Sequence, residues 1–151
     1  MTWVCSLADR DTRGTDVGVI APALDAFLIE LHSEPLPPEV VAWAHPLGSG
    51  ARAQKSQTDF YARKASKARW GESPHNYRLA LDSYPLILDA AGKRVVSGDP
   101  RHYLLIGVVA RRIGLAWGGT WLKFADHPHV EVPGWKTVVK AALGPTFPRA
   151  I

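Results

Sequence analysis

The chain has 151 residues, 46% of them hydrophobic, and this length fits one globular domain over residues 1–151 rather than two. Its 18 Lys and Arg against 14 Asp and Glu favour contact with polyanions, but no nucleic-acid reading motif accompanies this charge, so we expect no nucleic-acid partner. A single cysteine, Cys5, excludes an intramolecular disulfide, and the absence of an apolar run of about 18 residues excludes a membrane-spanning helix.

The N-terminal residues 1–19 are predicted to be a loosely ordered start. Charged residues interrupt residues 1–14, which therefore lack the apolar centre of a secretory signal. We expect synthesis in the cytoplasm without a signal peptide. The basic excess concentrates between Arg52 and Arg69, where a solvated helix face is the simplest interpretation and electrostatic contact with an anionic cell envelope is the alternative.

Helical spacing of apolar residues predicts a helix from about Pro22 to His32, with the proline in its first turn. Three prolines make residues 33–38 a stiff connector. A strand is expected at Val40–Ala44, and residues 54–66, free of glycine and proline, predict a helix with a basic exposed side.

The second half of the chain alternates strands and helices. We expect strands at residues 84–88, 94–96 and 130–132, a short helix at 136–143 and a tail at 144–151. Asp99-Pro100 is a typical helix start, with aspartate as the cap, and Gly114 a typical end. The apolar residues between them predict a largely buried helix.

Two clusters contain candidate metal ligands: His75 and Asp82, and further along Asp126 and His129. The spacing of the first pair suits a loop that enters a strand, with Asp82 at the head of the apolar run at residues 84–88. Two histidines and one carboxylate from separate elements can hold a zinc ion on three sides and leave the fourth side open. Asp126, three residues before His129, would then place an uncoordinated carboxylate beside the metal. On spacing alone, surface or structural histidines remain the favoured alternative.

Four segments occur in an order that carries a resemblance. They are Gly50-Ala51-Arg52-Ala53 with Gln57 and Phe60-Tyr61, then Ser73-x-His75-Asn76-Tyr77 through Leu79-Ala80-Leu81-Asp82, then Trp117-Gly118-Gly119-Thr120-Trp121, and last Asp126-x-Pro128-His129-Val130-Glu131 with Gly134-Trp135. Together they resemble the zinc peptidases that include D-alanyl-D-alanine carboxypeptidases and dipeptidases. The resemblance is closer to the L-alanyl-D-glutamate endopeptidases of phage endolysins and bacterial wall remodelling.

The resemblance implies an α+β fold of the Hedgehog and DD-peptidase kind, with helices packed on a small antiparallel sheet that carries the zinc ligands. It implies His75, Asp82 and His129 as ligands of a zinc ion and Asp126 as the general base. Glu131 shares a strand face with His129, so we expect it to orient that ligand, with the role of base as its alternative.

Other site residues follow from the same resemblance. Arg52 is expected to stabilise an oxyanion or grip a substrate carboxylate, with a surface arginine as the alternative. Ser73 and Gln57 are expected beside the ligands or in the substrate cleft. Of Trp117 and Trp121, one ring is expected to pack in the core and the other to line the cleft, and the pattern does not decide which.

One position departs from the family pattern, because Arg78 stands where relatives usually have glycine. If the backbone there needs a positive φ, the arginine costs about 1 kcal/mol. It could also place a cation near the substrate cleft.

The expected activity is cleavage of peptidoglycan stem peptides, between L-alanine and D-glutamate, by a monomeric phage or prophage endolysin without a separate wall-binding domain. Delivery to the wall would need another protein such as a holin. A D-alanyl-D-alanine carboxypeptidase and a non-catalytic wall-binding domain of the same fold are the alternatives.

Overall fold

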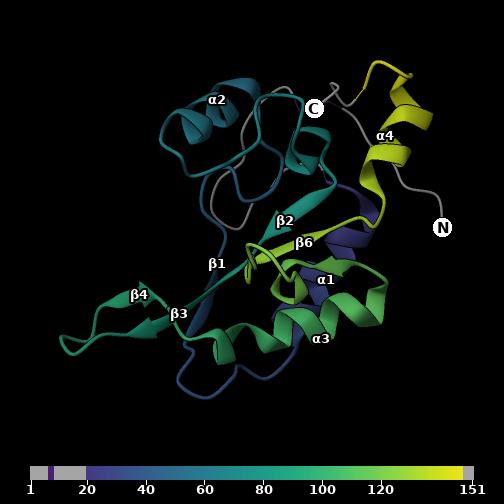
Figure 1. Cartoon of the computed structure of the whole chain (residues 1–151). Helices are drawn as coiled ribbons and strands as arrows, with labels where there is room; N and C mark the ends of the chain where they lie inside the picture. The colour runs from purple at the N-terminus through teal and green to yellow at the C-terminus, as the bar shows by residue number, and fades with distance from the viewer. Residues whose placement is uncertain (1–6, 9–19, 148–151) are drawn as a thin grey trace.

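Two antiparallel sheets organise the part of the chain that the structure, a computed structural model, describes, residues 7–8 and 20–147 (Figure 1). The first sheet has the order β1 (Ala42–Ala44), β3 (Tyr84–Leu88), β4 (Arg94–Val96), and the second the order β2 (Ala80–Asp82), β6 (His129–Glu131), β5 (Ala116–Trp117). The predicted loosely ordered start at residues 1–19 lies almost wholly outside the described residues. The α+β class is confirmed.

The register of the second sheet brings two distant candidates together. β2 runs antiparallel to β6, with Asp82 opposite His129 and Ala80 opposite Glu131. Opposite residues in a ladder present their side chains to the same face, and residues two apart on one strand share that face. The pairing therefore places Asp82, His129 and Glu131 on one side of the sheet.

Helices cover this sheet and bury the core. α1 (Pro22–Ser33) packs against α3 (Leu104–Ile113), and Figure 1 shows both on one side of the β2–β6 pair, with α2 (Gln54–Ala62) on the other side. α4 (Trp135–Leu143) follows the second sheet. The fully buried core side chains include Leu24, Phe27, Leu31, Ile106, Val109, Val130 and Val139. Among the described residues, no helix combines the length and apolar character that crossing a bilayer requires.

Most predicted elements are confirmed, some with different ends. The helix from Pro22 runs one residue further than predicted. The helix predicted over residues 54–66 ends at Ala62, because Lys64 takes a left-handed φ of 60° and the amides of Ala65 and Ser66 both donate to the carbonyl of Phe60. The chain thus leaves the helix for a loop earlier than composition suggests.

The helix predicted after Asp99 begins as a 3-10 turn, η2 (Pro100–Tyr103), and continues as α3. Asp99 accepts a hydrogen bond from the Arg101 amide, and Gly114 ends the helix at φ 88°. The prediction that this helix is largely buried was only half right. Leu104 and Val108 are half exposed, since only one face of α3 packs on the core.

One expectation about strands was wrong, and two strands, β2 and β5, were not predicted. Asp82 does not lead into the strand at residues 84–88: it ends β2, and β3 belongs to the other sheet. The short strand β5 was not expected at all, since the glycines after Trp117 argue against a strand. In the structure the two residues of β5 pair with β6 just before those glycines.

Candidate functional site

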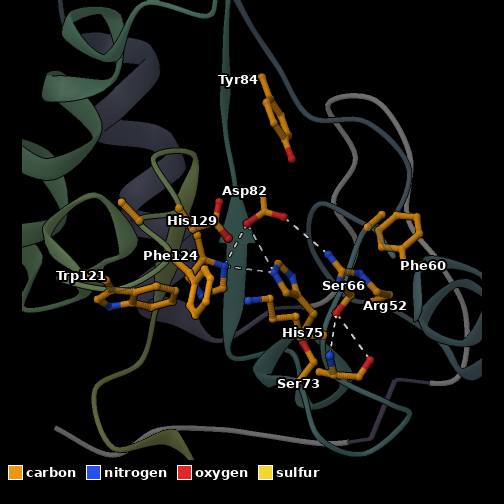
Figure 2. A pocket seen from close by; sticks show the side chains of 15 residues that line it. Arg52, Phe60, Ser66, Ser73, His75, Asp82, Tyr84, Trp121, Phe124 and His129 are labelled. Atoms are coloured by element: carbon orange, nitrogen blue, oxygen red, sulfur yellow. Dashed lines mark hydrogen bonds and ion pairs between the residues drawn. The ribbon is translucent and has the colours of Figure 1, made fainter. Parts of the chain in front are cut away.

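Three side chains from separate elements meet at one point. His75 comes from the 3-10 turn η1 (Pro74–Tyr77), Asp82 from the end of β2 and His129 from the start of β6. The His75 Nε2 lies 3.3 Å from the His129 Nδ1 and 3.4 Å from the Asp82 Oδ1, which is 3.0 Å from the His129 Nδ1 (Figure 2). All three residues are buried.

This spacing fits a small divalent cation. In a tetrahedral zinc site, with bonds of about 2.0–2.1 Å to nitrogen and oxygen, neighbouring ligand atoms are separated by about 3.3–3.4 Å. Two of the three distances match that edge, and the third is slightly shorter. Among the described residues, only these three form a group of histidine, cysteine or carboxylate side chains that could hold a metal ion.

Each imidazole makes a hydrogen bond on the side of its ring away from the cluster, and this bond determines which ring nitrogen faces the other two residues. The His75 Nδ1 lies 2.9 Å from the Gly50 carbonyl oxygen, which can only accept, so this nitrogen carries the hydrogen and Nε2 presents a lone pair. The His129 Nε2 lies 2.8 Å from a Glu131 carboxylate oxygen. Three acceptor atoms therefore converge, which requires a cation or a proton between them.

The pKa values of the cluster also indicate that a cation or a proton lies between its three acceptor atoms. Burial opposes the charge on Asp82, but the neighbouring His75 and the hydrogen bond from His129 hold the pKa of its carboxyl well below the usual range. Burial lowers the pKa of His129, yet its hydrogen bonds with Asp82 and Glu131 outweigh this and raise it to about 10. Burial lowers the pKa of His75. Without a metal, His129 therefore holds the proton at neutral pH.

The cluster forms the floor of a cavity of about 590 Å³. Its walls come from three parts of the chain: residues 65–68 with Arg52 and Phe60, residues 121 and 124–126, and Tyr84. Figure 2 shows Trp121 and Phe124 on one side of His75, and Arg52, Phe60 and Ser66 on the other. An open cavity with a cation site at its floor can admit a peptide.

Asp126 lies on the rim of this cavity. Although the residue is exposed, partial burial of its carboxylate and the nearby negative charge of Asp82 raise its pKa. Its backbone is tied on both sides, because the Asp126 amide donates to the Gly118 carbonyl and its own carbonyl accepts from the His129 amide. A carboxylate with a raised pKa, fixed beside a cation site, is suited to general acid–base catalysis.

Comparison with known proteins agrees with this chemistry. Residues 66–132, which contain all three residues of the cluster and Asp126, match the family profile described as D-alanyl-D-alanine carboxypeptidase. Over these residues the chain is similar to this peptidase family. The chain is also 33% identical over 98 residues to the peptidoglycan L-alanyl-D-glutamate endopeptidase CwlK of Bacillus subtilis (strain 168). This match covers 55% of this chain and 57% of CwlK.

The chain thus matches a little more than half the length of this curated relative. A solved structure, the Serratia marcescens L-Ala D-Glu endopeptidase ChiX, is similar with a TM-score of 0.49 and 24% identity over 73% of this chain and 74% of that chain.

Arg52 is buried rather than on the surface, so the alternative of a surface arginine is wrong. Its guanidinium donates to the Gly48 carbonyl, to the Gln57 side chain at 3.2 Å and to the second oxygen of Asp82 at 3.5 Å. It stacks on Phe60 with 4.5 Å to the ring centroid. Arg52 lines the cavity and also fixes the orientation of the Asp82 carboxylate.

Gln57 does not line the cavity and is fully buried. Its oxygen accepts from Arg52 and Asn76, and its nitrogen donates to the Ser66 hydroxyl and the Ala68 carbonyl. Gln57 therefore supports the cavity wall from behind, rather than contacting a substrate.

Glu131 and Ser73 support the histidines. Glu131 lies against the His129 Nε2, on the side of the ring away from the cluster, and is not among the cavity residues, so its position does not suit the alternative role of base. Ser73 lines the cavity and caps η1 through a reciprocal pair of hydrogen bonds with Asn76.

The two tryptophans divide their roles. The Trp121 ring lines the cavity, 5.3 Å from the imidazole of His129. Trp117 packs against Gly107 and Gly119, where a Cβ would lie within 2.4 Å of the indole ring, and its Nε1 donates to the His127 carbonyl. Trp117 is therefore the packing residue and Trp121 the cavity residue.

Arg78 takes φ 62° and ψ 29°, which confirms that this position needs a left-handed backbone. Its amide donates to the carbonyls of Pro74 and His75, so Arg78 closes the turn that presents His75. The expected cation near the cleft is not found here, because Arg78 is buried and does not line the cavity.

Sequence reasoning missed several cavity residues, among them Tyr84, Lys67 and Phe124. Burial and the charges of Asp82 and Asp126 raise the pKa of Tyr84, which keeps its phenol a hydrogen-bond donor. Tyr84 lies two residues after Asp82, but this spacing would have indicated a cavity residue only if a turn of the chain at Ser83 had also been predicted. Lys67 and Phe124 lie in loops, where no periodicity points to a face.

Proposed function

We propose that the chain is a zinc-dependent peptidoglycan endopeptidase that cleaves stem peptides between L-alanine and D-glutamate. The observation that carries the proposal is the convergence of His75, Asp82 and His129 on a cavity floor, with Asp126 on the rim. The choice of bond is supported by the similarity to CwlK over 98 residues. The endolysin setting stays a prediction from the resemblance alone.

The three residues of the cluster would hold the ion through His75 Nε2, Asp82 Oδ1 and His129 Nδ1. When bound, zinc acidifies water and polarises a carbonyl oxygen. Asp126 would take the proton from the attacking water and pass it to the departing nitrogen of the peptide. Its raised pKa brings its two protonation states closer in energy, which both transfers need.

Arg52 would contribute in two ways. It holds Asp82 Oδ2 at 3.5 Å and leaves Oδ1 to face the histidines. Its positive charge also lines the cavity, where it would favour the negative charge that develops on the scissile carbonyl oxygen.

The deciding experiment is digestion of a synthetic stem peptide, with mass analysis of the products. We expect a fragment that begins with D-glutamate, loss of cleavage after chelation and recovery on addition of zinc. Release of free D-alanine alone would instead show a carboxypeptidase, the alternative that the family's description favours.

A non-catalytic wall-binding domain is the remaining alternative. It would bind purified sacculi without releasing peptides over hours. The rim position of Asp126 and its raised pKa favour an enzyme, because a closed structural metal site needs no unbound carboxylate beside it.

A further inference from the structure

Two long cations line the cavity, Arg52 and Lys67, and they differ in their surroundings. Arg52 is buried and donates to the Gly48 carbonyl, Gln57 and Asp82. Lys67 is exposed, and among the described residues its ammonium pairs with no carboxylate. It lies instead over the ring of Phe124, 2.9 Å from the centroid, on the opposite wall.

The backbone of Lys67 is held in place. The buried side-chain nitrogen of Gln57 donates to the Ser66 hydroxyl at 3.1 Å and to the Ala68 carbonyl at 2.6 Å. The Ser66 hydroxyl also accepts from the Ala68 amide. Both neighbours of Lys67 are thereby tied to the residue that also contacts Arg52, so the lysine projects from an anchored point rather than from a free loop.

The contact with Phe124 leaves the ammonium available. Phe124 is 76% exposed, and a cation on an exposed aromatic ring is held weakly. A carboxylate that enters the cavity would offer a stronger, charge-assisted hydrogen bond. A short rotation of the lysine side chain would exchange one partner for the other.

The proposed substrate brings such a carboxylate. Whichever carboxyl group of D-glutamate continues the stem peptide, the other is free and lies a few bonds from the scissile nitrogen. Resting on the proposed function, we propose that Lys67 is a specificity-determining residue that binds this free carboxylate of the acidic residue on the leaving side of the bond. The other basic residues nearby, Arg63, Lys64 and Arg69, do not line the cavity.

The test compares two stem peptides that differ only at this group: one with D-glutamate as the free acid and one with the same carboxyl amidated. Steady-state cleavage is measured for the wild type, Lys67→Met, Lys67→Arg and the control Lys64→Met, which removes an exposed charge from the same loop without touching the cavity. Circular dichroism checks that all four proteins fold.

We expect the wild type to prefer the acid peptide by about tenfold in kcat/KM, the effect of one charge-assisted hydrogen bond. Lys67→Met should abolish the preference by raising KM for the acid peptide alone, since a binding contact equal in ground and transition states changes KM and not kcat. Lys67→Arg should restore part of the preference, and Lys64→Met should leave it intact.

Several results would overturn the inference: a preference that survives in Lys67→Met, an equal loss on both peptides, or an equal effect of Lys64→Met, which would indicate general surface charge. A wild type that cleaves both peptides equally well refutes the role of Lys67 but leaves the proposed function standing. A wild type that cleaves neither peptide refutes the proposed function, and the inference with it.

Discussion

The floor and the rim of the cavity are built differently. Each floor residue is buried and has an orienting partner: the Gly50 carbonyl for His75, Arg52 for Asp82 and Glu131 for His129. On the rim, Trp121 and Phe124 are 38% and 76% exposed. The comparison teaches that the fold itself fixes the cation site, while a few loop contacts place the residues that meet a substrate.

Replacing Asp82 by asparagine should abolish metal binding by the cluster at the cavity floor. The amide cannot replace the charge between Arg52 and His129, so two buried cations lose their partner, at a cost of about 3 kcal/mol or more in unfolding free energy. Metal content and stem-peptide cleavage should both fall to background. Denaturant unfolding in chelator and metal analysis measure the two effects.

The matched control is Asp89→Asn, in the exposed turn between β3 and β4, where an asparagine oxygen can still accept from the Ala91 and Lys93 amides. It should keep wild-type stability, metal and activity. An Asp82→Asn protein with full metal content would refute the assignment of the floor.

Replacing Asp126 by asparagine should separate rim from floor. We expect kcat to fall by about 10²–10⁴-fold, since the proton acceptor is lost, while the metal content stays that of the wild type. The unfolding free energy should change by less than about 0.5 kcal/mol because the side chain is exposed. A protein that loses its metal together with its activity would place Asp126 in the floor instead.

The proton on His129 predicts how the floor responds to pH. Its pKa is raised to about 10 in the folded, metal-free protein, against about 6.5 in the unfolded chain. The stability that this proton contributes is therefore fully present below pH 6.5 and is lost as the pH rises through 10. A bound cation must displace the same proton.

Zinc affinity should consequently rise by about tenfold per pH unit between pH 7 and 9, with one proton released per ion. Competition with a chromophoric chelator at several pH values measures the slope. The rim variant Asp126→Asn should show the same slope. An affinity that does not change with pH would mean that His129 is already neutral in the metal-free protein.

The sequence predicts the floor of the cavity better than it predicts the rim. Glu131 was expected beside His129 because strand alternation puts residues two apart on one face, and the structure places it there. The left-handed backbone at Arg78 was expected from a missing glycine. Both predictions concern local geometry, which short-range rules describe well.

Features of the rim were less predictable. Which tryptophan lines the cavity depends on Gly107, a residue of α3 that lies against Trp117 only through the tertiary fold. The place of Lys67 depends on hydrogen bonds from a buried amide in α2 to the loop that follows it. Such contacts leave no periodic pattern in the sequence, and the pairing of β2 with β6 likewise joins residues 47 positions apart.

A smaller substitution should move the rim and leave the floor in place. A Cβ on Gly118 would lie 2.4 Å from the Asp126 carbonyl oxygen, so Gly118→Ala must push the backbone of Asp126 away. Displacing a catalytic group by about an ångström costs between tenfold and a hundredfold in rate, and we expect a loss of kcat near the lower figure. Metal content should fall less than kcat, because the Asp126 carbonyl is joined to the floor only through the backbone amide of His129 and not through a metal-binding side chain. Gly98→Ala, where a Cβ meets nothing within 4 Å, is the matched control and should retain full activity. If Gly118→Ala also retained full activity, the position of Asp126 on the rim would matter less than its charge, and the proton transfer would have to tolerate a mobile carboxylate.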